Sequence, residues 1–432
     1  MKRGLALFIS IFFIISLLAG CSSGGQANQA EAKTKDGKTV VNFWSFWGSE
    51  TRRPIIDKIV KDFNNSQDKI VVKHTFLPWG DIWTKNLASV AAGNPADVVI
   101  NDINTVAQRA KNNQAEDLSK YVDDSFKNQF YPHLWQTVLY KDKPYGIPFN
   151  TDTRLLFYNK TAFKEAGLDP NKPPQTWKEL EEYAKKLDKK NGNRYERIGF
   201  YPLWGSIGAS SWMASADGGK GFIDNGKLNI NTPQKVKALE WLQGWKDRLG
   251  DKTVQSFQAD FGSQQANPFI AGKVAMWADV GTFYTQIRDY GKNMDFGVAQ
   301  IPAYDEQSKH WADGGGFVAE VPKGAKHPKE AMEFIKYLTG EKAQKYWALK
   351  NYDNVANKKG AEAAANELSG QAKDVYQMSV DNLKVTNLFP TPVEYPDYQN
   401  RINPYIDNVM LGKTSPEKAL KQAEEDVKKM KK

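Results

Sequence analysis

Hydrophobic positions along the chain recur with two periods, one typical of strands and one typical of helices. Segments 40–44 and 70–76 are short apolar or alternating runs, and each is predicted to be a strand. Between them lies a predicted helix whose apolar residues fall on one face at helical spacing: Ile55, Ile56, Ile59, Val60 and Phe63. The predicted fold therefore begins with a strand, a helix and a second strand.

The same alternation continues towards the C-terminus. Further strands are predicted over residues 97–100, 155–158, 274–278, 296–299 and 317–321. Further helices are predicted over residues 82–92, 177–187, 236–245, 331–338 and 416–431. Thr176 and Glu179 have the spacing of a capping box at the start of the second of these helices. Strands that alternate with helices predict an α/β architecture with parallel sheets.

Residues 1–20 have the pattern of a secretory signal peptide. Lys2 and Arg3 precede the apolar run Leu5–Leu18, which is shorter than the roughly 20 residues that a membrane-spanning helix needs. The stretch Leu18–Cys21 is similar to the bacterial lipobox, in which the cysteine is lipidated and becomes the first residue. Cys21 is also the only cysteine in the chain. We therefore predict an exported protein that is anchored to the membrane through a lipid on Cys21.

Residues 22–38 contain no aromatic residue and almost no aliphatic one. Such a segment cannot bury surface, so residues 21–38 are predicted to be the lipidated cysteine and a flexible tether. Removing residues 1–20 leaves 412 residues, which suffice for two or three domains. Charged residues make up 25% of the chain and hydrophobic residues 41%, the composition of a globular protein.

The formal charge of +9 comes from Lys and Arg residues that are dispersed among many acidic ones. A nucleic-acid-binding surface would need basic residues clustered on one face, so no nucleic-acid partner is predicted. The chain also has 13 Trp and 18 Tyr residues. Some of these rings will form the core, and such a surplus also suits a protein that binds flat, half-polar ligands.

Motifs for catalysis, metals and cofactors are missing from the sequence. The four histidines are far apart and have no cysteine beside them, and no P-loop or G-x-S-x-G motif occurs. The run 314–319 fits G-x-G-x-x-A, but it precedes a strand rather than a helix, so the dinucleotide interpretation fails. Paired carboxylates for glycoside hydrolysis come from distant positions, and nothing indicates a particular pair. No cofactor and no metal site are predicted.

Aromatic and polar residues follow several predicted strands, where ligands bind in open α/β sheets. A sugar ring has apolar faces and a rim of hydroxyls, so aromatic platforms beside amides or carboxylates suit it. Core packing of each Trp and helix capping by each Asp or Asn explain these positions equally well. The candidates at these strand ends are Phe46, Trp47, Asn101, Asp102, Asn104, Trp277 and Asp279.

Seven segments, taken in order, resemble the bacterial extracellular solute-binding proteins of carbohydrate ABC importers, the group that includes maltose-binding protein. The most specific is GIPFNTDTRLLFYNK at residues 146–160. The others are NFWSFWG (42–48), GNPADVVI (93–100), PPQTWKELEEYAKKL (173–187), SADGG (215–219), FIAGKVAMWADVG (269–281) and GFVAEVPKGAKHPKEAMEFIKYL (316–338).

The resemblance implies a type II periplasmic-binding-protein fold, in which two α/β lobes joined by a hinge enclose a ligand cleft. It implies an N-terminal lobe of residues 39–150 plus 296–340 and a C-terminal lobe of residues 151–295 plus 341–432. The chain would leave the first lobe near Asn150, return near Phe296 and leave again near Gly340.

The resemblance also adds candidate ligand contacts. Asp152 stands where maltose-binding protein has a cleft glutamate, Trp79 lies near a common aromatic position, and Trp204 precedes the SADGG segment. Tyr395 and Tyr398 lie near another aromatic platform. With Gly315 in the glycine run, the predicted ligand-binding residues are Phe46, Trp47, Trp79, Asn101, Asp102, Asn104, Asp152, Trp204, Trp277, Asp279, Gly315, Tyr395 and Tyr398.

Two departures from the family pattern argue against maltose as the ligand. Many members have Gly-x-Trp after the strand at 274–278, whereas this chain has the segment 279–283, which lacks the Trp. A stacking ring is lost there unless Trp277 or Phe283 replaces it. Asn101 stands where the maltose-binding pattern has Trp. The remaining Trp residues favour an oligosaccharide that spans several subsites.

The predicted function is therefore capture of a sugar and its delivery to an ABC permease, by a monomer without enzymatic activity. Its predicted location is the extracellular face of the cell membrane in a Gram-positive organism, or the periplasmic face in a Gram-negative one. A secreted polysaccharide hydrolase or lyase and a sugar sensor or adhesin are the alternatives. Ligand that stays unchanged after long incubation would exclude the enzyme, and neighbouring permease genes would favour import.

The identity of the sugar stays undecided at this stage. Arg52, Arg53 and Arg154 lie near the predicted cleft loops and are compatible with an acidic, pectin-derived sugar. Neutral oligosaccharides from xylan or arabinan fit the residues equally well. Arg52 and Arg53 also suit the first turn of a surface helix, where they would not contact the ligand.

Overall fold

The computed structural model describes residues 33–431. The predicted signal peptide, the lipidation of Cys21 and residues 22–32 of the predicted tether lie outside the described residues. Residues 33–38 form a hydrogen-bonded turn, in which the Thr34 N–H donates to the Lys38 carbonyl at 2.9 Å. None of the helices in residues 33–431 is long and apolar enough to cross a membrane.

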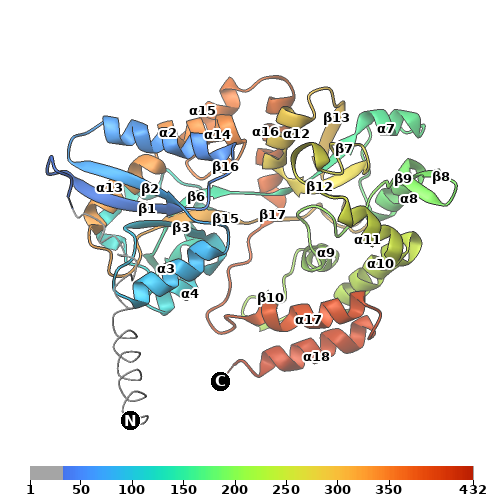
Figure 1. Ribbon diagram of the computed structural model, residues 1–432. Helices are drawn as coiled ribbons and strands as arrows, with labels where there is room; N and C mark the ends of the chain where they lie inside the picture. The colour runs from blue at the N-terminus through green and yellow to red at the C-terminus, as the bar shows by residue number, and fades with distance from the viewer. Residues whose placement is uncertain (1–32, 432) are drawn as a thin grey trace, which may run out of the picture.

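A six-stranded mixed sheet forms the centre of the first of two lobes (Figure 1). Its strands, in spatial order, are β16 (Asn354–Val355), β6 (Ile147–Thr151), β15 (Gly316–Glu320), β3 (Val98–Asp102), β1 (Thr39–Ser45) and β2 (Ile70–Phe76). Pairing is parallel only among β1, β2 and β3. The prediction of parallel sheets is wrong for the rest, because β6 and β15 join the sheet where the chain leaves for the other lobe and returns from it.

Helices cover both faces of this sheet, with α2, α14 and α15 above it and α3 and α4 below it in Figure 1. The predicted apolar face of α2 is buried as expected, and α2 packs against α13 and α14. The helices are α2 (Arg52–Asn65), α3 (Asp81–Ala91), α4 (Val106–Lys111), α5 (Asp124–Lys127), α6 (Pro132–Thr137), α13 (Pro328–Leu338), α14 (Glu341–Asn351) and α15 (Lys358–Glu367). The small hairpin of β4 (Leu139–Tyr140) and β5 (Lys143–Pro144) completes this lobe.

The second lobe contains a three-stranded antiparallel sheet of β12 (Met276–Val280), β7 (Arg154–Asn159) and β13 (Phe296–Gln300). Its helices are α7 (Lys160–Glu165), α8 (Trp177–Leu187), α9 (Ala209–Ala216), α10 (Pro233–Leu249), α11 (Asp251–Ala259), α12 (Tyr284–Tyr290), α16 (Gly370–Asn382), α17 (Tyr398–Met410) and α18 (Pro416–Lys428). Small hairpins pair β8 (Lys189–Asn191) with β9 (Arg194–Arg197), and β10 (Ile223–Asp224) with β11 (Lys227–Leu228).

Three chain crossings join the lobes. The first runs from β6 directly into β7, the second from β13 to β15, and the third from α15 to α16. Parallel pairing of β14 (Ala312–Asp313) with β17 (Thr386–Asn387) ties the second crossing to the chain that follows α16.

The structure differs from the predicted lobe boundaries at two places. Strand β13 pairs with β7 in the second sheet, so the chain returns to the first lobe after Gln300 rather than near Phe296. Strand β16 pairs with β6, and α14 packs against α2 and α15. Residues 341–367 therefore belong with the first lobe, although the sequence predicted them in the second.

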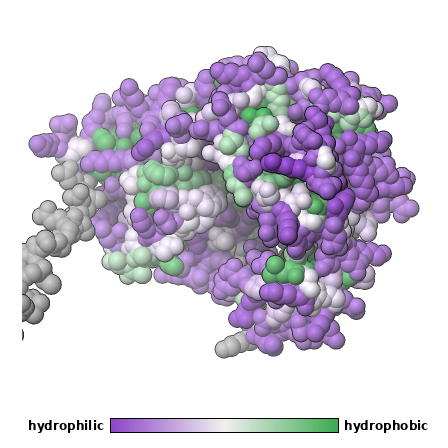
Figure 2. All heavy atoms as spheres, turned by 45° about the vertical axis from the view of Figure 1, so that its right-hand side comes forward, coloured by the Kyte–Doolittle hydropathy of each residue, from purple (hydrophilic) through white to green (hydrophobic). Residues whose placement is uncertain are grey.

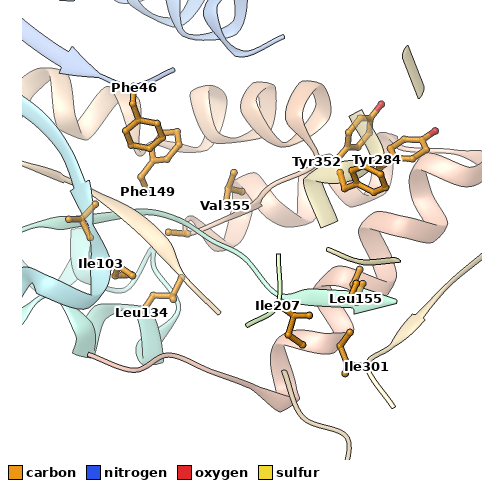
Figure 3. Close-up of a cluster of buried hydrophobic side chains, with 14 of the residues drawn as sticks. Phe46, Ile103, Leu134, Phe149, Leu155, Ile207, Tyr284, Ile301, Tyr352 and Val355 are labelled. Atoms are coloured by element: carbon orange, nitrogen blue, oxygen red, sulfur yellow. The ribbon is translucent and has the colours of Figure 1, made fainter. Parts of the chain in front are cut away.

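The hydrophobic core extends from one lobe through the crossings into the other (Figure 3). Phe46 and Phe149 lie together in the first lobe, and Leu155 and Ile301 lie together in the second. Tyr284 on α12 contacts Tyr352 edge to face, with ring centroids 4.8 Å apart, which links the lobes beside Val355. The crossings are therefore held at both ends by buried side chains.

Candidate ligand-binding cleft

A cavity of about 380 Å³ lies between the lobes. Figure 2 shows the surface hollowed between the two halves of the molecule. The first lobe and the first two crossings line it with Trp79, Asp102, Asn104, Thr105, Asp152, Arg154, Asp313, Gly314, Gly315, Gly316 and Phe317. The other lining residues belong to the second lobe and to the segment between β17 and α17: Ser210, Ser211, Ala214, Gly221, Phe222, Phe389, Thr391, Tyr398 and Gln399.

Strand ends position the polar groups of the first-lobe wall. Asp102 is the last residue of β3, and its Oδ1 accepts a hydrogen bond from the Asn104 N–H at 2.7 Å, which fixes the short turn at 103–105. Asp152 follows β6 directly, and its Oδ1 accepts a hydrogen bond from the Gly315 N–H at 2.7 Å. The carboxylate of Asp152 therefore holds the first two crossings together at the base of the cavity.

Arg154 lies at this base among several acceptors. It forms an ion pair with Asp152, its Nε lies 3.8 Å from Asp313 Oδ1, and it donates to the Ser206 carbonyl at 3.2 Å. Burial alone would lower the pKa of Arg154, but the surrounding carboxylates outweigh burial and raise it. The guanidinium is therefore a permanent counter-ion of these carboxylates.

Two carboxyls on the wall are shifted towards their protonated form. Burial raises the pKa of Asp102, against the opposing effects of the Asn104 N–H and the Arg109 charge. Burial also raises the pKa of Asp313, against the charge of Arg154 and a 2.9 Å hydrogen bond from the Ser211 hydroxyl. Within residues 33–431, the buried Oδ1 atoms of Asp313 and Asn104 have no hydrogen-bond partner. Both acceptors belong to residues that line the cavity.

Trp79 is the aromatic platform of the cavity. Trp79 is 60% exposed, although three other aromatic rings contact its indole. Phe46 lies 4.8 Å away at 85°, Trp83 4.8 Å away at 72°, and Phe317 5.6 Å away at 86°. These edge-to-face contacts hold the indole while leaving much of its surface free, which is the geometry that stacking on an apolar sugar face requires.

Six of the thirteen predicted ligand-binding residues line this cavity: Trp79, Asp102, Asn104, Asp152, Gly315 and Tyr398. A seventh, Asp279, lies instead on a second hollow of about 410 Å³ between the loop 49–52 and the second lobe. Its Oδ2 accepts a hydrogen bond from the Trp277 indole at 2.8 Å. The charge of Asp279 also raises the pKa of Arg154, which lines the main cavity. Asp279 is therefore near Arg154, and the two hollows lie on either side of the crossing from β6 to β7.

The other predicted residues lie in the protein interior. Trp47 is 1% exposed and packs against Phe149 and Trp347, with ring centroids 4.7 and 4.5 Å away. Phe46 supports Trp79 from below, and Asn101 is buried with its Nδ2 donating to Glu320 Oε2 at 2.7 Å.

The predicted aromatic residues of the second lobe are also buried. Trp204 packs between Phe257 and Phe261, and Tyr395 is 4% exposed. Trp277 and Phe283 are buried too, so neither replaces the missing stacking Trp. These rings pack in the core because residues distant in the sequence cover them.

Several lining residues were not among the sequence candidates. Ser211 comes from α9, Asp313 from β14, and Phe389 from the segment after β17. Asp313 had one usable signal, the glycine run that follows it. A Cβ at Gly316 would lie 2.4 Å from the Asn150 carbonyl oxygen, so only glycine allows the two crossings to approach there.

The described residues show no sign of a metal centre. In residues 33–431, no three His, Cys, Asp or Glu side chains converge in a way that could hold a metal ion. The side chains that line the cavity are carboxyls, amides, hydroxyls, aromatic rings and the Arg154 guanidinium.

Comparison with known proteins places this geometry in context. Residues 47–345 match the family model described as "Bacterial extracellular solute-binding protein". A solved structure, "CpMnBP1 with Mannotriose Bound", is 28% identical, covers 90% of this chain and 99% of its own, and has a TM-score of 0.80.

Two curated relatives bind different ligands by name. The arabinooligosaccharide-binding protein of Bacillus subtilis is 26% identical and matches 82% of this chain and 80% of its own length. The sn-glycerol-3-phosphate-binding periplasmic protein UgpB of Escherichia coli K12 is 28% identical over 63% of this chain and 62% of its own length. The matches therefore include proteins named for neutral sugars and one named for an anion.

Proposed function

Because the chain belongs to the family of bacterial extracellular solute-binding proteins, we propose that it captures an extracellular oligosaccharide between its lobes and delivers it to the permease of an ABC importer. The protein binds its ligand without changing it. The observation that carries this proposal is the interlobe cavity, in which an exposed indole faces buried acceptors that have no donor within the described residues.

The cavity residues divide into two roles. Trp79 stacks on an apolar sugar face, while Asn104 and Asp313 accept hydrogen bonds from hydroxyls. Asp152 and Gly315 hold the crossings at the base, and Tyr398 also lines the cavity. A short oligosaccharide of mannose or arabinose units, such as plant mannans and arabinans yield, is the ligand class that the similar proteins suggest.

Delivery depends on a change in the relative position of the lobes. Because walls from both lobes contact one ligand, binding favours the arrangement in which the walls are close. The permease then recognises the surfaces of both lobes together. The protein acts as a monomer, and a lipid on Cys21 keeps it at the membrane. Replacing Cys21 with Ser would release the protein into the medium, whereas unchanged membrane retention would contradict this anchoring.

A calorimetric panel tests the proposal. The chain from residue 21 onwards with Cys21→Ser is titrated with mannotriose, arabinotriose, xylotriose, maltotriose and glycerol 3-phosphate. We expect at least one neutral trisaccharide to bind with a micromolar dissociation constant, about 8 kcal/mol. At a hundredfold excess over that constant, the ligand stabilises the fold by about 2.7 kcal/mol.

Two results would contradict the proposal. The first is the absence of binding to every sugar in a panel extended to longer chains. The second is cleavage of the bound sugar, detected by chromatography after long incubation, which would favour the hydrolase alternative.

A further inference from the structure

The charges on the cavity wall are opposite in sign to the charge of the chain as a whole. The chain carries a formal charge of +9. The residues that line the main cavity include three carboxylates, Asp102, Asp152 and Asp313, and one cation, Arg154. Glu50 and Asp279 line the second hollow together with Arg52. A ligand that enters between the lobes therefore meets more carboxylates than cations.

Of the three arginines near the cleft, only Arg154 lines the main cavity. Arg154 pairs with Asp152 and lies 3.8 Å from Asp313, so its charge is compensated within the protein. Arg52 donates from Nε to Asn351 Oδ1 at 3.3 Å. Arg53 is exposed on α2, and its guanidinium lies 6.0 Å from the centre of the Phe76 ring. Arg52 and Arg53 thus stand in the first turn of α2 and do not line the main cavity.

Two buried acceptors of the wall have no hydrogen-bond donor in residues 33–431, although one of them, Asp313 Oδ1, lies 3.8 Å from Arg154 Nε. The other is Asn104 Oδ1. A hydroxyl can donate to such an atom, whereas a carboxylate or phosphate brings only further acceptors to it. Placing two acceptor oxygens in contact without a hydrogen between them costs free energy, because neither oxygen then has a donor. Repulsion between two negative charges adds to this cost.

We propose that Asp102 and Asp313 make this cleft selective for uncharged, hydroxyl-rich sugars and exclude uronic acids and sugar phosphates. The inference rests on the proposed function, since it specifies the ligand class of the same cavity. Ligand hydroxyls donate to these carboxylates. Because burial raises the pKa of both carboxyls, an anionic group in place of a hydroxyl is repelled at a pH high enough to ionise them. The compensated Arg154 maintains the base of the cavity and does not serve as an anion site.

A matched pair of ligands tests this selectivity. The neutral probe is mannotriose, or the tightest neutral trisaccharide of the panel, and the acidic probe is its counterpart with carboxylates at C6. Glycerol 3-phosphate is a second anion. Calorimetry at pH 8 with the unsubstituted protein should give at least 100-fold tighter binding of the neutral probe.

Substitutions then assign the discrimination to residues. Asp313→Asn and Asp102→Asn each remove a charge while keeping an acceptor, and each should reduce the neutral-to-acidic ratio at least tenfold. Asp295→Asn, on the surface of the second lobe beside Lys164, should leave the ratio unchanged. Thermal melting identifies any variant that fails to fold. If one cavity variant fails, the neutral-to-acidic ratio of the other cavity variant tests the selectivity.

Each result has a defined meaning. Acidic binding as tight as neutral binding, or a ratio that neither cavity variant alters, overturns the charge selectivity while leaving sugar capture intact. Binding of no sugar, neutral or acidic, overturns the proposed function and this inference with it. A large ratio that falls in the cavity variants and not in Asp295→Asn supports the inference.

Discussion

Two tryptophans at equivalent positions in the sequence have opposite environments in the fold. Trp47 follows β1 and Trp79 follows β2. These two strands are parallel neighbours, so their C-terminal ends lie at the same end of the sheet. Trp47 is nevertheless 1% exposed beneath Trp347 of α14, whereas Trp79 is 60% exposed on the cavity wall. Burial of the first ring depends on a helix some 300 residues away in the sequence, so the local pattern could not distinguish the two.

Substituting these two residues should separate binding from stability. Trp79→Ala should weaken mannotriose binding about tenfold or more, equivalent to at least about 1.4 kcal/mol, because the stacking surface is lost. Its unfolding free energy should change little. Trp47→Ala should instead lower the unfolding free energy by about 3–5 kcal/mol through the cavity it leaves. Calorimetry and urea unfolding measure both effects, and full affinity in Trp79→Ala would remove that residue from the site.

The site could be predicted where a strand end decides the position of a side chain. Asp102 ends β3 and Asp152 directly follows β6, and both line the cavity. Asp313 lies on the second crossing, where only the glycine run after it marks the chain, and Phe389 lies on the segment after β17, which no period or motif marks. Their positions are set by contacts between lobes, which a one-dimensional pattern does not contain.

Secondary structure was more predictable than connectivity. Half of the capping box expected at α8 is present: Thr176 Oγ1 accepts from the Glu179 N–H at 3.2 Å, whereas Glu179 Oε2 accepts from the Gln175 N–H at 2.7 Å instead of the Thr176 N–H. Such signals are local and depend on adjacent residues. The sequence did not predict the antiparallel pairing of β7 with β12 and β13. The relative direction of two strands depends on how the chain connects them in space, which a local pattern does not record.

Residues 388–397, here called the strap, connect β17 to α17 and contact the first lobe on the way. The Thr391 N–H donates to the Asn104 carbonyl at 2.7 Å, and Gln108 Nε2 donates to the Pro392 carbonyl at 2.5 Å. Lys111 Nζ donates to the Val393 carbonyl at 3.0 Å. The strap thus fixes Phe389 and Thr391 in the cavity wall by bonds to α4 and the turn before it.

Loosening the strap should weaken ligand binding without removing any ligand contact. Gln108→Ala leaves the Pro392 carbonyl without its donor, and we expect about a fivefold to tenfold loss of affinity, about 1 kcal/mol. Lys111→Ala, which removes an exposed bond to the same segment, is the control and should change affinity less than twofold. Calorimetry measures both variants. Equal affinities for Gln108→Ala and the unsubstituted protein would show that strap anchoring is not needed.

The whole molecule consists of two lobes joined by three chain crossings. Buried hydrophobic side chains pack at both ends of the crossings, and polar side chains lie between them. Asp152, Arg154 and Asp313 lie at the crossings, and the aromatic contact of Tyr284 with Tyr352 joins the lobes beside them. Rotation about these crossings requires few backbone changes, because hinge motion is absorbed by a few residues at the ends of elements. Residues 152–153 between β6 and β7 are the shortest such connection.

Ligand binding should therefore shift the lobes towards one arrangement. Moving an equilibrium from 1:99 to 99:1 needs about 5.5 kcal/mol of differential affinity, which is within the roughly 8 kcal/mol of a micromolar ligand. We expect the radius of gyration from small-angle scattering to decrease when a binding trisaccharide is added at saturation. Trp79→Ala at the same ligand concentration, below its own saturation, should show a smaller decrease. An unchanged radius in protein that calorimetry shows to be saturated would mean that the lobes already hold their ligand-bound arrangement, and the permease would then need another signal to distinguish loaded from empty protein.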